Sequence, residues 1–167
     1  MPAHDPFQKL VQELGRWREA LEALHCTVTE DRPAANDVAL ADYYENAVTD
    51  ALGWLAEALQ AAERAAEMAG GGENFRNVGR GLALVHARIN DLARQHLVEI
   101  AGWERVSDLT ELGRRRGRQW QRWAEAVRRS LESVPEAQHA AQSALAEAWQ
   151  AMQFSTAPSG ALKQHAN

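Results

Sequence analysis

The amino-acid sequence predicts an all-α fold, an up-and-down bundle of four to five long amphipathic helices. Apolar residues recur every three or four positions over most of the chain, which is the spacing of one helix face. Alanine is frequent while valine, isoleucine and phenylalanine are scarce, and this composition favours helix over sheet. No segment alternates apolar and polar residues as a half-buried strand would.

The length and composition indicate one domain with its own core. The chain has 167 residues, of which 46% are hydrophobic and 25% are charged, as in ordinary globular domains. We expect this domain to cover residues 5–154. The apolar period is lost from Ser155, so we expect residues 155–167 to form a mobile C-terminal tail.

The first predicted helix runs from Asp5 to about His25. Asp5 offers a side-chain oxygen as N-cap, and Pro6 stands at the first helical position, where its missing N–H costs nothing. The segment 26–37 loses the helical period and contains Pro33, so it is expected to be a loop. The apolar stripe of this helix is Phe7, Leu10, Leu14, Trp17, Leu21 and Leu24.

The second predicted helix is capped by Asp37 and continues to about Ala69, where Gly70, Gly71 and Gly72 end it. Two apolar strips follow it, so this helix is either buried broadly or faces a partner. Tyr43 and Trp54 are the residues of the second strip that we expect to contact a partner. The main stripe is Leu40, Tyr44, Val48, Ala51, Leu55, Leu59 and Ala62, and the second is Tyr43, Ala47, Trp54, Ala58 and Ala61.

The third predicted helix has the most regular stripe and continues past Gly102. His96 falls on this stripe, which indicates a buried histidine with one hydrogen-bond partner or, alternatively, a pH-sensitive contact. The first three helices share the seven-residue period of coiled coils. The stripe of the third helix is Phe75, Val78, Leu82, Val85, Ile89, Leu92, His96 and Ile100.

The fourth predicted helix begins at a capping box formed by Asp108 and Glu111. Pro135 either ends it or kinks it, so residues 108–153 are one kinked helix or two helices. The large apolar residues are Leu109, Leu112, Trp120, Trp123, Val127, Leu131 and Val134, followed by Leu145 and Trp149.

A basic segment lies within this helix at residues 114–129, which hold seven arginines, two tryptophans and one acid. Helical phase at about 100° per residue places the tryptophans near the stripe and most arginines opposite it. Arg116 instead lies near the centre of the stripe, and we expect it to stack on Trp17 or Trp120. The outward arginines form a ridge of Arg114, Arg115, Arg118, Arg122 and Arg129.

The charge is unevenly distributed along the chain, whose formal net charge is −5. Residues 1–70 carry a net −8, whereas residues 76–129 carry a net +6. The two parts should attract one another when they pack. The acidic total argues against general nucleic-acid binding, because phosphate-binding domains are basic overall.

The sequence predicts no catalytic, metal or cofactor site. The Glu-x-x-His pairs at Glu22 and Glu136 have the spacing of helical di-metal sites but flank the apolar stripes. Arg80 and His86 are spaced as in HEPN-type helical ribonucleases, yet Gly81 stands where that family has a polar residue, and the two side chains flank the stripe. We therefore expect a protein that is not an enzyme.

The cysteine content and the N-terminal segment indicate a cytoplasmic protein. Cys26 is the only cysteine, so no intramolecular disulfide forms. The N-terminal segment lacks the charged flank and apolar run of a signal peptide. No apolar stretch approaches the ~20 residues that span a membrane.

The function expected from these features is a protein-interaction or assembly module, an adaptor or accessory subunit that binds another protein or itself as a homo-oligomer. The alternative is a nucleic-acid-binding accessory protein that uses the arginine ridge. Alanine-rich helices with scattered tryptophans also resemble phasins, the proteins that coat storage granules. That resemblance implies a surface-coating role for the second apolar strip of the helix over residues 37–69.

Overall fold

The computed structural model confirms the all-α class, and its described residues form four helices. The backbone is described for residues 5–30, 38–67, 72–106 and 111–165, and the side chains for residues 5–30, 42–67, 72–102 and 118–153. No strand occurs within these ranges. The helices are α1 (Pro6–Thr29), α2 (Val38–Glu67), α3 (Gly72–Val106) and α4 (Glu111–His165).

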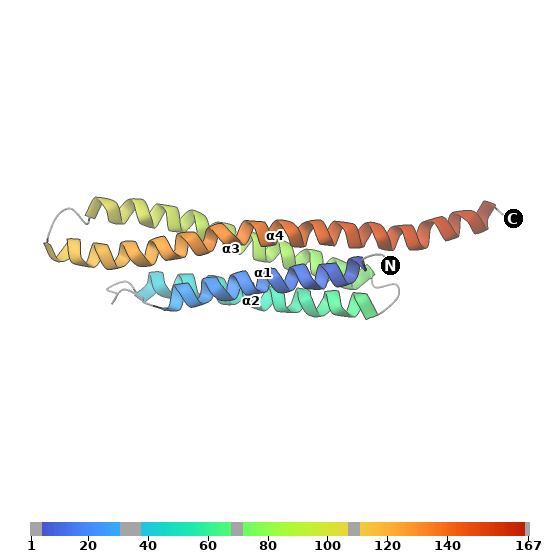
Figure 1. The fold of residues 1–167 in the computed structure, drawn as a ribbon, viewed down its shortest axis with the longest axis horizontal. Helices are drawn as coiled ribbons and strands as arrows, with labels where there is room; N and C mark the ends of the chain where they lie inside the picture. The colour runs from blue at the N-terminus through green and yellow to red at the C-terminus, as the bar shows by residue number, and fades with distance from the viewer. Residues whose placement is uncertain (1–4, 31–37, 68–71, 107–110, 166–167) are drawn as a thin grey trace.

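Successive helices run in opposite directions and each contacts two others (Figure 1). Helix α1 packs against α2 and α4, and α3 packs against the same two helices. The helices differ in length, so α3 and α4 together extend beyond α1 and α2 at one end. At the other end α4 continues alone towards the C-terminus.

The N-terminus of α1 forms as the sequence predicts. The carboxylate of Asp5 accepts a hydrogen bond from the backbone N–H of Phe7 at 3.0 Å, and Pro6 occupies the first helical turn. This cap satisfies one of the backbone donors that the first turn leaves without a helical partner.

The C-terminus of α1 lies one turn beyond the predicted end at His25. Val28 is fully buried and continues the apolar stripe, so its burial favours the extra turn. The hydroxyl groups of Thr27 and Thr29 donate to the carbonyl oxygens of Ala23 and His25 at 3.0 and 2.9 Å. These bonds keep the threonines compatible with helix, which the threonine-rich sequence alone did not indicate.

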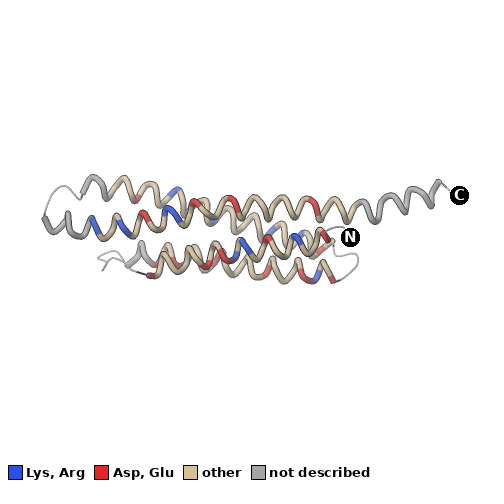
Figure 2. Tube along the Cα trace, viewed as in Figure 1, with Lys and Arg blue, Asp and Glu red and all other residues tan. Residues whose placement is uncertain are grey.

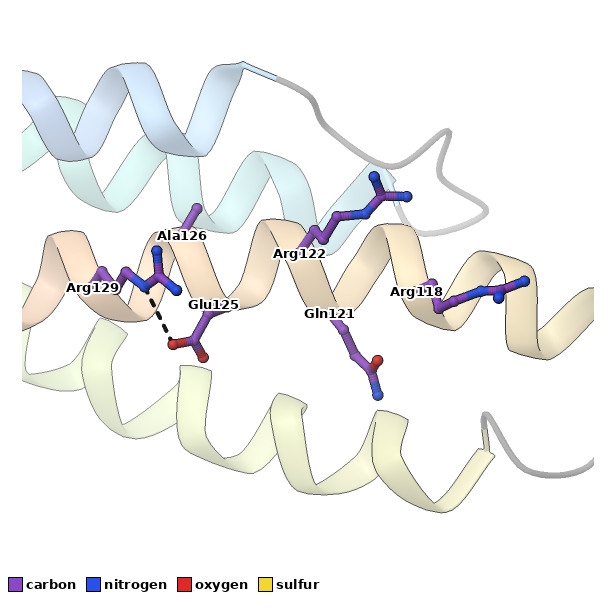
Figure 3. A pocket seen from close by; sticks show the side chains of 6 residues that line it. All are labelled: Arg118, Gln121, Arg122, Glu125, Ala126 and Arg129. Carbon is purple, nitrogen blue, oxygen red and sulfur yellow. Dashed lines mark ion pairs between the residues drawn. The ribbon is translucent and has the colours of Figure 1, made fainter.

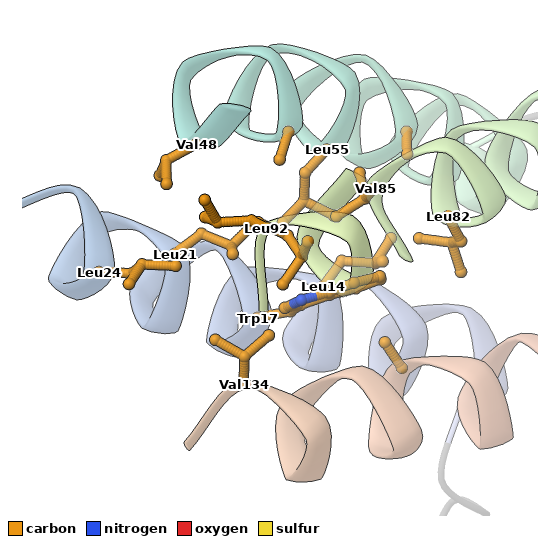
Figure 4. Packing of buried hydrophobic residues seen from close by; sticks show 14 of the residues in the cluster. Leu14, Trp17, Leu21, Leu24, Val48, Leu55, Leu82, Val85, Leu92 and Val134 are labelled. Atoms are coloured by element: carbon orange, nitrogen blue, oxygen red, sulfur yellow. The ribbon is translucent and has the colours of Figure 1, made fainter. Parts of the chain in front are cut away.

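The core is apolar and receives side chains from all four helices. Figure 4 shows Trp17 of α1 between Leu14 and Leu21, facing Val85 of α3 and Val134 of α4. Trp17 is fully buried, and its indole N–H has no hydrogen-bond partner among the described atoms. The largest fully buried apolar residues are Trp17, Tyr44, Leu10, Leu14, Leu21, Leu24, Leu55 and Leu92.

Helices α2 and α3 approach closely at Gly81. An added Cβ at Gly81 would lie 2.9 Å from the Cβ of Ala58 and 3.3 Å from the carbonyl oxygen of Trp54. Ala47 and Ala61 of the second apolar strip are also buried. Most of that strip is therefore core, as the broad-burial alternative expected.

Helix α4 passes through Pro135 without ending. Leu131 and Val134 before the proline and Ala141 and Ala144 after it are all buried, so one apolar face continues across it. Pro135 is exposed, which places its missing hydrogen bond on the side where water can replace it. The two-helix alternative for residues 108–153 is therefore wrong.

The loss of the apolar period at Ser155 does not end α4, because its backbone stays helical to His165. The predicted cap Asp37, the glycines Gly70 and Gly71 and the predicted capping residue Asp108 lie outside the described residues. Within the described helices, no segment combines the length and the apolar character that a membrane crossing requires.

Replacing Pro135 with alanine should raise the free energy of unfolding by about 2 kcal/mol. The change restores a backbone hydrogen bond and removes a steric clash, which together stabilise the helix by about 3 kcal/mol. Alanine also gives the unfolded chain more conformational freedom than proline, and this lowers the gain by about 1 kcal/mol. Urea unfolding followed by circular dichroism measures this difference. Pro135→Gly is the control and should gain about 1 kcal/mol less than Pro135→Ala. An unchanged or lower stability in Pro135→Ala would contradict the prediction.

Candidate functional site

His96 of α3 is buried, with 1% of its surface exposed, and both ring nitrogens have partners. Its Nδ1 lies 2.7 Å from the hydroxyl oxygen of Tyr44 on α2, and its Nε2 lies 2.9 Å from the carbonyl oxygen of Ala124 on α4. A carbonyl oxygen only accepts, so we assign the proton to Nε2, which donates to Ala124. Nδ1 then accepts from the hydroxyl of Tyr44.

Trp123 of α4 joins this cluster to α1, the one helix that His96, Tyr44 and Ala124 do not belong to. Its ring stacks on Tyr44 with centroids 5.2 Å apart and an interplanar angle of 16°. Its indole N–H donates to the carbonyl oxygen of Val28 at the end of α1, at 3.3 Å. One connected group of side chains therefore contacts all four helices.

Burial sets the protonation of this cluster. It lowers the pKa of His96 below its ordinary value, because the charged imidazolium loses its hydration. It also raises the pKa of the Tyr44 hydroxyl above its ordinary value. Both groups are neutral near pH 7, and both ring nitrogens are engaged within the protein. The two hydrogen bonds of His96 thus tie α2 and α4 to α3 within the core.

The second feature is the arginine face of α4, which we define as Arg118, Arg122 and Arg129. Figure 3 shows these side chains along one side of the helix, around a surface depression of about 480 Å³. Trp120 and Trp123 are 4% and 5% exposed, so the tryptophans of this segment belong to the core. The structure thus separates the two residue types within one helix.

A carboxylate partly neutralises this face. Arg129 lies 3.5 Å from Glu125, and Arg128 pairs with both Glu125 and Glu132. The hydrogen bond from Arg128 lowers the pKa of Glu125 below its ordinary value. Within the described part of the chain, Arg118 and Arg122 form no ion pair and are exposed. These two are therefore the arginines of this face that no described carboxylate neutralises. Figure 2 shows basic and acidic positions following one another along this part of α4.

The side chains of Arg114, Arg115 and Arg116 lie outside the described residues. The expected stacking of Arg116 on Trp17 or Trp120 therefore falls outside the described residues and stays a prediction.

The third feature is a groove of about 300 Å³ between α2 and α3. Trp54 and Glu57 stand on its α2 wall, Leu84 stands on its α3 wall, and Gly81 lies at its floor. Trp54 is half-buried and Leu84 is 48% exposed. We call this depression the α2–α3 groove.

Tyr43 does not line this groove, and its ring is covered by the side chain of Arg88. The guanidinium carbon of Arg88 lies 5.7 Å from the centre of its ring, and Arg88 also reaches Asp50 at 3.4 Å. The cation therefore covers part of the ring that the sequence analysis assigned to a partner. Of the two predicted contact residues, Trp54 lines the α2–α3 groove and Tyr43 does not.

The spacings tested for enzymatic chemistry do not converge in the structure. His86 hydrogen-bonds to Gln138 of α4, whereas Arg80 lines the groove towards α2. Glu22 pairs with Arg18 on its own helix at 3.5 Å. Among the described residues, no group of three histidine, cysteine, aspartate or glutamate side chains could hold a metal ion.

Sequence reasoning missed several residues of these features. The partners of His96, namely Tyr44 and Ala124, belong to other helices, and their register along the bundle was not in the sequence pattern. Leu84 falls outside the apolar stripe of α3, so only its position beside Trp54 identifies it. Its position as a leucine outside the apolar stripe was the signal in the sequence that could have indicated an exposed apolar residue.

Comparison with known proteins adds no information on identity. No protein-family model, no curated protein and no solved structure matches the chain.

The stability of the protein should fall as the pH drops below about 6.5. The unfolded chain binds a proton at His96 near pH 6.5, whereas the folded chain binds it only at lower pH. The stabilisation by neutral His96 is complete above this pH and is lost as the pH falls through the folded-state pKa. The slope is at most about 1.4 kcal/mol per pH unit.

Urea unfolding between pH 5 and pH 7.5 measures this slope. His96→Gln should remove it, whereas His139→Gln should leave it unchanged because His139 is exposed. A constant difference between the wild type and His96→Gln across this range would show that His96 does not carry the pH dependence.

Proposed function

We propose that this chain is a non-enzymatic interaction module, an adaptor or accessory subunit that binds another protein or a second copy of itself. The module consists of four long amphipathic helices in up-and-down order and works in the cytoplasm, as the single Cys26 suggests. Its contact surface is the α2–α3 groove.

The observation that carries this proposal is the position of Trp54. Its indole is half-buried beside Leu84, an exposed leucine on the neighbouring helix. Tryptophan is enriched among binding hot spots, because it buries a large apolar area at small entropic cost. The close approach of Gly81 to Ala58 brings the two walls of the groove together.

A photo-crosslinking aromatic amino acid at position 54 should capture a defined partner in the native host. The same residue at Gln142, an exposed position on α4, is the matched control and should capture none. Trp54→Ala should then weaken binding of the captured partner about 30-fold, the equivalent of about 2 kcal/mol for a hot spot. Equal capture at both positions, or unchanged binding of Trp54→Ala, would contradict the assignment.

A second candidate function is nucleic-acid binding through the arginine face of α4. The observation that favours it is that Arg118 and Arg122 are exposed and have no ion pair within the described part of the chain. Their positions are four residues apart, so they lie on adjacent turns of one helix face. Such a face could meet successive phosphates of a nucleic-acid backbone.

If this second candidate is correct, Arg118→Glu combined with Arg122→Glu should reduce the salt dependence of duplex DNA binding. Each lost phosphate contact lowers the slope of log K against log salt by about 0.9, so the two together account for about 1.8. Fluorescence anisotropy over a salt series measures the slope. The control is Arg76→Glu with Arg94→Glu, which changes the net charge equally on α3. Absence of binding at low salt would exclude this function.

A further inference from the structure

The α2–α3 groove carries charged groups that specify the chemistry of its occupant. Arg64 lies on the α2 wall and Arg80 on the α3 wall. Neither arginine forms an ion pair within the described part of the chain, and both are exposed. Two available cations therefore stand on opposite walls of the groove that also holds the half-buried Trp54 and the exposed Leu84.

From this arrangement we infer that the groove binds an acidic amphipathic helix of a partner protein, an inference that rests on the proposed function. The apolar side of that helix packs on Trp54 and Leu84, and its carboxylates meet Arg64 and Arg80. This mode of recognition places one apolar helix face in a groove and reads the flanking charges for specificity.

The dimensions of the groove suit a short helix. Trp54 and Arg64 are ten residues apart on α2, which is about 15 Å along its axis, or about three helical turns. The floor at Gly81 has no side chain, and a Cβ there would already be 2.9 Å from Ala58. Helix α2 takes the space that a side chain at Gly81 would need, so the two walls of the groove meet closely there.

One carboxylate orients the occupant. Glu57 also lines the groove and precedes Arg64 by seven residues, so the two lie on the same side of α2 and about 10 Å apart. A partner helix fits best with a carboxylate over Arg64 and a neutral or basic residue over Glu57. The same Glu57 disfavours a uniform polyanion such as a nucleic-acid backbone, which would bring phosphates towards it.

The test uses three labelled model peptides of about 14 residues and the full chain. Two share one leucine and alanine face, and their polar positions are glutamate in the first and lysine in the second. The third keeps the glutamates but replaces the apolar face with serine. Fluorescence anisotropy at low salt should show that the glutamate amphipathic peptide binds at least about tenfold more tightly than either of the others.

Charge reversal then locates the effect. Arg64→Glu with Arg80→Glu should invert the preference towards the lysine peptide, whereas Arg76→Glu with Arg94→Glu, which makes the same change outside the groove, should keep the wild-type preference. Arg64→Gln with Arg80→Gln should abolish the preference, which provides a second readout if the reversed variant unfolds. Circular dichroism checks that each variant is folded.

Equal affinity for all three peptides, or a preference that persists in the Arg64/Arg80 variants, would overturn the inference. Tight binding of the serine peptide would also overturn it, because charge alone would then suffice. These outcomes can be distinguished from a failure of the proposed function, which is tested by capture at position 54. A partner captured at position 54 that remains bound to the Arg64/Arg80 variants would support the interaction module while rejecting the acidic helix.

Discussion

The buried pair of hydrogen bonds at His96 constrains the arrangement of the helices. An imidazole without partners in an apolar core would be strongly destabilising, so Tyr44 and Ala124 must lie at the same level as His96. That requirement sets the register of α2 and α4 against α3. Trp123 extends the constraint to α1 through its stacking on Tyr44 and its bond to Val28. A hydrophobic stripe alone tolerates sliding by a turn, whereas this network does not.

The surfaces available for binding follow from that register. Because Trp123 is directed into the core, the opposite side of α4 must face outward, and Arg118 and Arg122 lie on it. Helices α2 and α3 meet closely at Gly81, and Trp54 lies partly buried at the edge of the groove, where it also packs against the core. Charged and aromatic residues that are neighbours in the sequence therefore lie on different surfaces of the bundle.

Local sequence signals and burial conflict at two points, and burial prevails at both. Threonine at positions 27 and 29 and proline at position 135 each disfavour helix, yet α1 and α4 continue through them. Val28 on α1 and Ala141 on α4 become buried as a result. Apolar contacts made after each weak helix former outweigh a local cost of a few kcal/mol.

The sequence by itself determined the helical class, the apolar stripes and the division of α4 into inward tryptophans and outward arginines, because all of these follow from a period of 3.6 residues. It also determined the N-cap at Asp5, because the side-chain oxygen and the following Pro6 act locally. It also identified Trp54 and His96 as residues that depart from the simple pattern. Only the tertiary structure decided what they contact. Three contacts depend on the axial register of neighbouring helices: those of His96 with its partners, of Arg88 with Tyr43, and the position of Trp54 beside Leu84. This register is set by contacts between residues far apart in the chain, which no local period encodes.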